Sequence, residues 1–358
     1  FGKGVLVTED NMSTSQPLPQ SSRQEMFNYV ESELLAIEPT ISQTTAYGHA
    51  NKGAVQMLLA RLYLNAQVYT GTARYTDALT YLNKVVAGGY TLDTNFKRVF
   101  SADNNSSPEI IFPLIADPIG TQSYGNSTYI INGSSGGTPQ TLNPALLGST
   151  AGWGGHRATK AWYGLFGSSL TDYNAGTQAD LVASTDVRAS LFWQTDQSYE
   201  MNNYKTWTDG YPSTKFTNLL STGGGTVSDF SGADFPMFRL ADAYLMYAEA
   251  VLRGGSGGSL SQALTYVNQI RTRAHATNIT QSQLSLDFIL AERARELNLE
   301  GIRRTDLIRY GKFTGSSYLW PWKGGVQNGA SIPSNYNLFP IPLSAINANP
   351  NLTQNPGY

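Results

Sequence analysis

The stretch ERARELNLEGIRRTDLIRYG, Glu292 to Gly311, concentrates charge in a chain that otherwise carries little of it. Asp, Glu, Lys and Arg make up 14% of the residues, whereas about a quarter is usual in soluble domains. Glu292, Glu296 and Glu300 follow one another at helical spacing and would share one helix face, where carboxylates repel unless cations neutralise them. The stretch is therefore either an acid–base site or an ion-pair lattice that holds the fold together.

The arginines of this stretch favour the structural interpretation. Hydrolysis of a glycoside needs two carboxyl groups held across the sugar, one of them with a raised pKa. Carboxylates surrounded by arginines have lowered pKa values and make poor general acids. The arginines within reach of the glutamates are Arg293, Arg295, Arg303 and Arg304. We therefore predict a scaffold role for the stretch, and a protein that is not an enzyme.

The rest of the composition is typical of a protein that binds a neutral polar ligand. The net charge is −2 with a pI near 6.0, and no Lys/Arg block is present, so we predict no nucleic-acid partner. Ser, Thr, Asn, Gln and Gly are abundant, together with 21 Tyr and 6 Trp. Amides, hydroxyls and aromatic rings suit a sugar, although a secreted protein with long loops has the same composition.

No sequence pattern indicates a cofactor, a metal or a nucleophile. The chain has no cysteine, which excludes a disulfide framework, a thiol nucleophile and a thiolate metal site. His49, His156 and His275 lie far apart and outside any metal-binding motif. The G-x-S-x-G match at residues 254–258 lies between two helical segments, so we interpret it as a linker. We predict no cofactor; a structural calcium ion is compatible with the sequence, but nothing in it indicates one.

Two similar helix pairs are predicted from apolar periodicity. The sequence ALTYLNKVV at Ala78–Val86 has a counterpart, ALTYVNQIR, at Ala263–Arg271. Each is preceded by a similar helical segment, LARLYL from Leu59 and LADAYL from Leu240. Each pair has roughly the length of a tetratricopeptide unit, ~34 residues. Such pairs bury their apolar faces by stacking on one another.

Between these pairs the helical period fails. Gly, Ser, Thr, Asn and aromatic residues dominate, and short apolar runs at Ile110–Ala116 and Tyr129–Ile131 are read as short strands. We predict a mainly α fold: a tetratricopeptide-type helix-pair scaffold with a large, irregular, loop-rich lobe containing short strands. One unit overall is expected, with scaffold at residues 1–100, a ligand-binding lobe at 101–235, and the second pair, charged helix and tail at 236–358.

The charged stretch also carries a resemblance. Together with YLWPWKGG (Tyr318–Gly325) and the closing LFPIPLSAINANPNLTQNPGY (Leu338–Tyr358), it is similar to the C-terminal half of the SusD/RagB family. GVLVTED at residues 4–10, GWGGHRATK (Gly152–Lys160) and FRLADAYLMYAEA (Phe238–Ala250) also resemble that family. The resemblance implies a tetratricopeptide-type scaffold in a surface-exposed outer-membrane lipoprotein. It further implies capture of oligosaccharide for import through a SusC-like TonB-dependent transporter.

The resemblance also implies what lies outside the sequence and which ligand to expect. Family members are longer at the N-terminus, where they carry a lipidated cysteine, so we expect an N-terminal part, with its anchor, to be missing here. A starch-type α-glucan is the expected ligand. The alternatives are a peptide-binding, RagB-like uptake lipoprotein and, less favoured, a glycoside hydrolase. The sequence does not specify which glycan binds.

The candidate site is predicted from aromatic residues in the loops. Sugars stack their C–H faces on aromatic rings and bond their hydroxyls to amides, guanidinium groups and hydroxyls. In starch-binding members of the family an arc of aromatics from the irregular region holds the glucan, and the resemblance suggests its counterparts here. The predicted ligand residues are Tyr124, Tyr129, Trp153, Asn126, His156 and Arg157. For Trp320 and Trp322 we predict packing of the tail instead.

Overall fold

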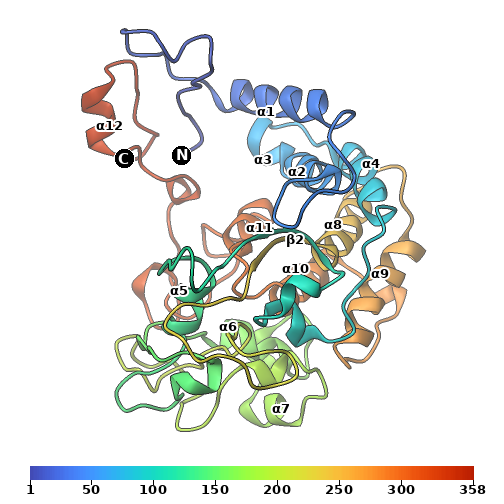
Figure 1. Cartoon of the computed structure of the whole chain (residues 1–358), viewed down its shortest axis with the longest axis vertical. Coiled ribbons are helices and arrows are strands. Elements are labelled where there is room, and N and C mark those ends of the chain that lie inside the picture. Colours follow the sequence, from blue (N-terminus) through green and yellow to red (C-terminus); the bar gives the residue numbers. More distant parts are fainter.

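A stack of helices and an irregular lobe make up most of the computed structural model, which describes residues 1–358 (Figure 1). The stack contains α2 (Lys52–Leu64), α4 (Tyr75–Val86), α8 (Leu240–Leu252) and α9 (Leu260–Arg273). Helix α4 packs against both α2 and α8, and α8 packs against α9, so the two predicted pairs share one core. The mainly α prediction, with stacked helix pairs, is confirmed.

Further helices complete the scaffold and occur within the lobe. Helix α1 begins after a capping box, in which the Ser22 hydroxyl and the Glu25 carboxylate each bond the other residue's backbone N–H. Helices α8 and α9 are joined by the glycine-rich segment 254–258, as predicted for a linker. Apart from the helices of the charged stretch, the remaining helices are α1 (Arg23–Ile37), α3 (Ala66–Thr70), α5 (Asn126–Gly133), α6 (Lys160–Tyr163), α7 (Gln178–Ala183) and α12 (Leu343–Ala348).

The charged stretch forms two helices and not the single helix that its spacing predicted. Helix α10 (Leu286–Glu296) ends before the third glutamate, and α11 (Arg303–Arg309) begins after a turn. Two residues of that turn have left-handed backbone, Leu299 with φ 62° and Gly301 with φ 76°. Glycine adopts this conformation readily, so Gly301 suits the turn, although it lies beyond the C-cap of α10 at Leu297.

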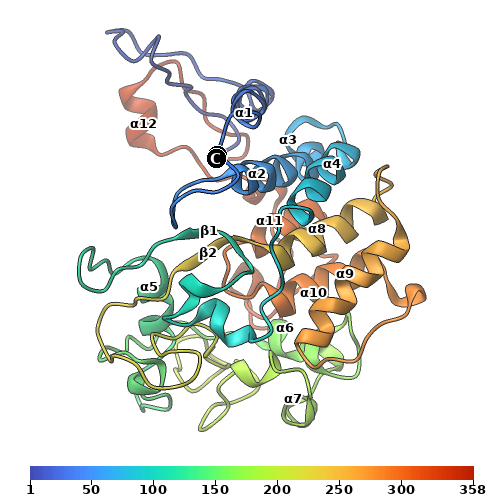
Figure 2. The same ribbon diagram turned by 45° about the vertical axis from the view of Figure 1, so that its right-hand side comes forward.

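One small sheet lies where the chain enters and leaves the lobe. Strand β1 (Ile110–Leu114) pairs antiparallel with β2 (Phe235–Arg239), so that the chain leaves the scaffold along one strand and returns along the other (Figure 2). The strand predicted in the run from Ile110 is confirmed. The strand predicted at Tyr129–Ile131 is wrong, because these residues belong to α5. A three-residue apolar run does not distinguish the two periods. The boundaries at residues 101 and 236 stay a prediction.

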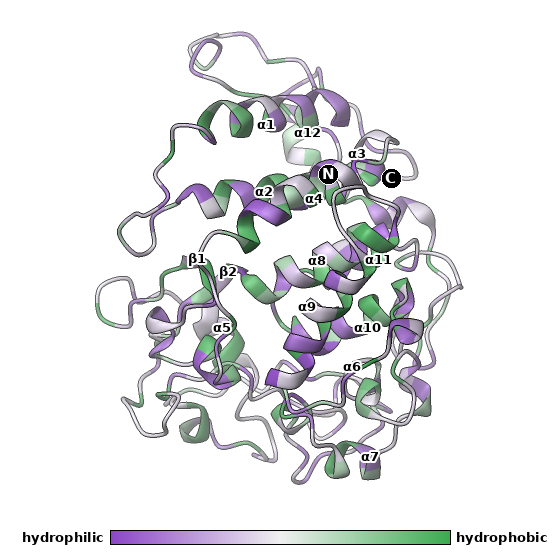
Figure 3. Ribbon diagram, turned by 90° about the vertical axis from the view of Figure 1, so that its right-hand side faces the viewer, coloured by the Kyte–Doolittle hydropathy of each residue, from purple (hydrophilic) through white to green (hydrophobic).

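A lattice of buried ion pairs joins the lobe to the scaffold. Glu292 and Glu296 of α10 are fully buried, and each pairs with arginines from outside its own helix. Figure 3 shows hydrophilic and hydrophobic residues mixed along α10. The carboxylates of the lattice are Glu109, Asp186, Glu292, Glu296 and Glu300, and the cations are Arg188, Lys215, Arg239, Arg271, Arg273 and Arg295.

The lattice keeps its carboxylates ionised. Burial alone would raise the pKa of Glu292, but the guanidinium groups of Arg188, Arg295 and Arg271 outweigh burial and lower that pKa to about 2. The pKa of Glu296 is also lowered, because Arg273, Arg239 and Arg188 oppose the effect of its burial. Carboxylates held in this state do not donate protons near neutral pH. The geometry therefore agrees with a scaffold role for the charged stretch.

The two ends of the chain lie side by side and hold each other (Figure 1). The side-chain amide of Asn355 donates to the carbonyl oxygens of Phe1, at 2.7 Å, and Phe339, at 2.9 Å. The side-chain amide of Asn351 donates to the carbonyl oxygen of Pro17 at 2.6 Å. None of the helices combines the length and the apolar character needed to cross a membrane.

Candidate functional site

Three exposed aromatic rings meet on the surface of the lobe, and we call them the aromatic arc: Tyr124, Trp153 and Tyr129. Their exposed fractions are 60%, 43% and 54%, respectively. The ring centroid of Trp153 lies 6.0 Å from that of Tyr124 and 6.1 Å from that of Tyr129. Phe230 extends the group, 4.9 Å from Tyr124, and was not among the predicted residues. Exposed rings in such a row form a surface on which a sugar can stack.

The backbone around Trp153 explains how the indole ring is kept exposed to solvent. The Trp153 N–H donates to the carbonyl oxygen of Asn132 at 2.7 Å, at the end of α5. A Cβ on Gly152 would come within 2.7 Å of the Cα of Gly136, and one on Gly154 within 2.6 Å of the Cα of Gly137. Real Cβ atoms do not approach so closely, so the two segments dock only because glycines face glycines. Their contact anchors the loop while the indole stays exposed.

His156 continues the arc on the far side of Tyr129. The imidazole centroid lies 4.6 Å from the Tyr129 ring, in an edge-to-face arrangement. Burial lowers the pKa of His156, so the ring is neutral at pH 7. Its Nδ1 has no partner within the protein, and it faces Gly133, where a Cβ would come within 2.5 Å. Through this edge-to-face contact His156 packs against the Tyr129 ring.

The side-chain amide of Asn126 and the terminal nitrogens of Arg157 are hydrogen-bonded within the protein. The Asn126 amide donates to the carbonyl oxygens of Leu114, at 3.3 Å, and Ile115, at 3.5 Å, which ties α5 to the end of β1. The Arg157 guanidinium donates to the carbonyl oxygens of Tyr204, at 2.5 Å, and Thr206. Both residues adjoin the arc and position its loops. Their predicted contact with ligand stays a prediction.

A hollow of about 460 Å³ begins behind Tyr129, and we call it the Tyr129 hollow. It lies between α5, the segment before α6 and the turn between α10 and α11. The residues that line it are Tyr129, Ile130, Ser134, Gly155, His156, Arg157, Ala158, Trp162, Ser213, Asn298, Leu299 and Gly301. Three of the six predicted residues therefore line one depression next to the arc.

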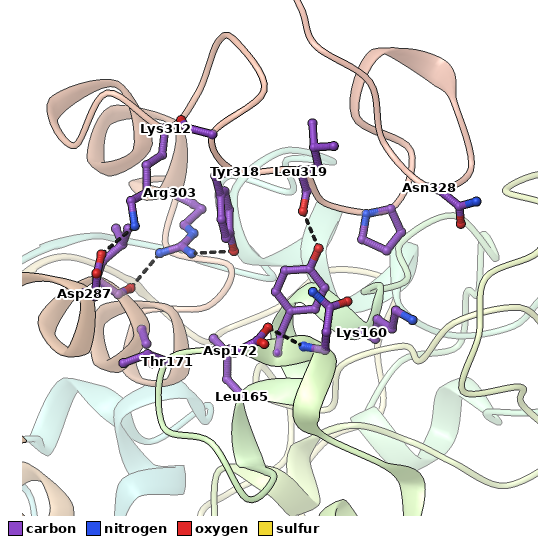
Figure 4. Close-up of a pocket in the computed structure, with 16 residues that line it drawn as sticks. Lys160, Leu165, Thr171, Asp172, Asp287, Arg303, Lys312, Tyr318, Leu319 and Asn328 are labelled. Carbon is purple, nitrogen blue, oxygen red and sulfur yellow. Dashed lines mark hydrogen bonds and ion pairs between the residues drawn. The ribbon is translucent and has the colours of Figure 1, made fainter.

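A second hollow, of about 480 Å³, lies between the lobe and the tail, and its polar groups are largely paired with one another (Figure 4). Arg303 donates to the carbonyl oxygen of Leu290 at 2.7 Å and to the Tyr318 hydroxyl at 3.4 Å. Lys312 pairs with Asp287 at 2.5 Å. These internal pairs leave few donors for a ligand, so this hollow is a weaker candidate than the arc.

The two tryptophans of the tail pack as predicted. The Trp320 ring stacks on Phe313 with centroids 6.0 Å apart. The Trp322 indole N–H donates to the carbonyl oxygen of Met201 at 2.9 Å, and its ring meets Tyr204 edge to face at 5.0 Å. Both tryptophans are half-buried.

No cluster of three or more His, Asp or Glu side chains in the structure is placed to hold a metal ion.

Known proteins resemble the chain along all or most of its length. The starch-binding protein SusD of Bacteroides thetaiotaomicron is 35% identical over 395 aligned residues, covering all of this chain and 69% of that protein. A SusD-like protein of Bacteroides ovatus is 26% identical, covering 87% of this chain and 56% of that protein.

Solved structures share the fold at lower sequence identity. A SusD superfamily protein from Parabacteroides distasonis superposes with a TM-score of 0.71 at 21% identity, covering all of this chain and 74% of that one. Surface glycan-binding protein A from Bacteroides uniformis gives 0.71 at 20% identity, covering 99% of this chain and 73% of that one. The model of the SusD family matches residues 171–358. This match, the 35% identity and the shared fold together show that the chain belongs to the SusD family.

Proposed function

We propose that the protein captures oligosaccharide at the surface of the outer membrane for uptake into the cell, and that it binds the glycan without cleaving it. The observation that carries the proposal is the aromatic arc, in which three exposed rings lie about 6 Å apart in a family whose relatives include a starch-binding protein. A soluble protein does not expose a row of large aromatic rings without a reason.

The proposed ligand is a starch-type α-glucan. The relative with 35% identity is named a starch-binding protein, and the chain covers 69% of its length. An α-glucan curves, so successive sugar units can follow rings that are tilted against one another by 56° and 57°, as the rings of the arc are. The proposed partner is a SusC-like TonB-dependent transporter, which would receive the glycan, and the proposed anchor is a lipid on an N-terminal segment.

The buried carboxylates support binding without hydrolysis. The acidic cluster of the charged stretch is buried among arginines, so its carboxylates are not exposed to a sugar. Asp and Glu are also absent from the lining of the Tyr129 hollow. A hydrolase needs a carboxylic acid with a raised pKa beside the bond that it cleaves. No observation here favours the peptide-binding alternative, since the arc presents neutral rings and not charges.

The test is Trp153→Ala, with Tyr336→Ala as matched control. Tyr336 is similarly exposed, at 51%, but lies in the tail segment outside the arc. Isothermal titration with maltoheptaose should show a loss of about 1–2 kcal/mol for Trp153→Ala, roughly five- to thirty-fold in Kd, because one stacking face is removed. Tyr336→Ala should bind as the wild type does. Equal affinities for all three proteins would contradict the assignment of the arc.

A further inference from the structure

The Tyr129 hollow is continuous with the aromatic arc. Tyr129 belongs to both: its ring centroid lies 6.1 Å from that of Trp153 and 4.6 Å from that of the His156 imidazole, and Tyr129 lines the hollow. A glycan chain that crosses the arc from Trp153 to Tyr129 therefore arrives at the edge of the hollow. The volume of about 460 Å³ lies within the range of small-ligand sites.

The side chains that line the hollow are suited to binding a neutral sugar unit. Ile130, Trp162 and Leu299 supply apolar walls for the C–H faces of a pyranose. Hydroxyl, amide and imidazole groups supply partners for its hydroxyls, and the imidazole is uncharged near pH 7 because burial lowers the pKa of His156. Asp and Glu are absent from the lining, so nothing there would attract a lysine or arginine side chain of a peptide.

Three polar atoms of the lining residues lack a partner within the protein. They are the hydroxyl oxygen of Ser134, a residue that is only 1% exposed, Nδ1 of His156, and Nε of Arg157, whose terminal nitrogens already donate to carbonyl oxygens. Buried polar groups are nearly always paired, and an unpaired group costs free energy. A hydroxyl-bearing ligand in the hollow could satisfy such groups, whereas a purely apolar ligand could not.

We propose that the Tyr129 hollow is an additional subsite, which holds a sugar unit of the glycan beyond those that stack on the aromatic arc. The proposal rests on the proposed glycan function and adds a dependence on chain length. A short oligosaccharide occupies the arc alone. A longer one also reaches the hollow, so that its affinity contains a contribution from Ile130, Trp162 and the polar lining.

Gly155 offers a way to block the hollow without disturbing the arc. It lines the hollow, its φ is not in the left-handed region, and an added Cβ would meet only the carbonyl oxygen of Gly133, at 3.8 Å. Gly155→Phe therefore adds a ring in this space, and Gly155→Ala is the matched control that adds one methyl group. Ala158→Phe, at another lining position, serves as a second blocking variant if Gly155→Phe does not fold.

The experiment compares maltotriose, which has as many sugar units as the arc has rings, with maltoheptaose by isothermal titration. We expect the wild type and Gly155→Ala to bind maltoheptaose more tightly than maltotriose by about tenfold, the equivalent of 1.4 kcal/mol. Gly155→Phe should lose most of this difference while its Kd for maltotriose stays within about twofold of the wild-type value. A melting curve of each variant checks that it is folded.

Other outcomes overturn the proposal in distinguishable ways. If Gly155→Phe keeps the full advantage of maltoheptaose, the hollow does not hold a sugar unit. If it weakens both ligands equally, the substitution acts on the arc and no separate subsite exists. If the wild type binds neither ligand, the proposed α-glucan function fails, and the subsite fails with it.

Discussion

Removing the carboxylate of Glu296 should destabilise the protein by about 3–5 kcal/mol, the usual cost of breaking a buried ion pair from one side. This side chain is fully buried and accepts from Arg188 at 2.9 Å, Arg239 at 2.7 Å and Arg273 at 2.5 Å. In Glu296→Ala these three guanidinium groups keep other carboxylates, but they also remain close to one another in a dry environment. Their mutual repulsion and the lost hydrogen bonds make up the expected cost.

The matched control is Glu200→Ala. Glu200 also pairs with a cation, Lys160 at 2.8 Å, but its side chain is 51% exposed. Exposed pairs of this kind contribute about 0–1 kcal/mol. The free energy of unfolding of both variants is measured by chemical denaturation, and the glycan affinity of the folded protein by titration. Glu296→Ala should lose stability and bind normally, and Glu200→Ala should change in neither respect.

Two results would refute this reasoning. Equal stabilities of Glu296→Ala and Glu200→Ala would show that the lattice does not hold the lobe on the scaffold. A variant of normal stability that no longer binds glycan would place Glu296 in the binding site. If Glu296→Ala does not fold, Glu296→Gln keeps the volume of the side chain and removes only its charge, with an expected loss of about 2–3 kcal/mol for its charged hydrogen bonds.

Three further predictions follow from the same geometry. Acid should destabilise the protein between about pH 4.5 and 2, because the folded-state pKa of Glu292 and that of Glu249 are lowered to about 2. Each ionised carboxylate then contributes about 3 kcal/mol to the free energy of unfolding at neutral pH, and this contribution is lost on protonation, so a protein that stays stably folded at pH 2 in a denaturation series would contradict the prediction. Maltoheptaose incubated with the protein should keep its length in chromatography. A cleaving activity that co-purifies with the protein and releases shorter products would contradict binding without hydrolysis. Gly154→Ala should lower both the melting temperature and glycan affinity, because its φ is +60° and its Cβ would meet Gly137, whereas Gly155→Ala should change neither.

The helix pairs were predictable from the sequence because their signal is local. Apolar residues at helical spacing and the copy of ALTYLNKVV at Ala263–Arg271 specify both pairs and their stacking. The break between α10 and α11 was not predicted, because Leu299 adopts left-handed backbone without being a residue type that favours it. Such a turn depends on tertiary contacts, which a helical spacing does not contain.

The site was predictable in its residue types but not in its geometry. Tyr124, Tyr129 and Trp153 were chosen because they lie in segments rich in amides and glycines, which were expected to be loops; Tyr129 belongs to α5, and the structure places the three rings together. Phe230 was missed, since it is 106 residues from Tyr124 and no local pattern links them. Arg188 and Lys215 of the ion-pair lattice are likewise distant in sequence from the glutamates that they contact.

The ion-pair lattice is buried while the three rings of the aromatic arc are exposed, the reverse of the common arrangement for these residue types, and the lobe explains why. Its segments take part in hydrophobic clusters of only five to nine buried residues, some of which also include residues outside the lobe, whereas the helical stack has a cluster of 32. A lobe with so little apolar surface to bury is not oriented by the hydrophobic effect, which is non-directional. Buried ion pairs have fixed geometry, and their best-supported role is to specify one arrangement over others. Because Arg188 and Lys215 fix the lobe from within, Tyr124, Trp153 and Tyr129 are not needed for its packing and remain exposed for a ligand.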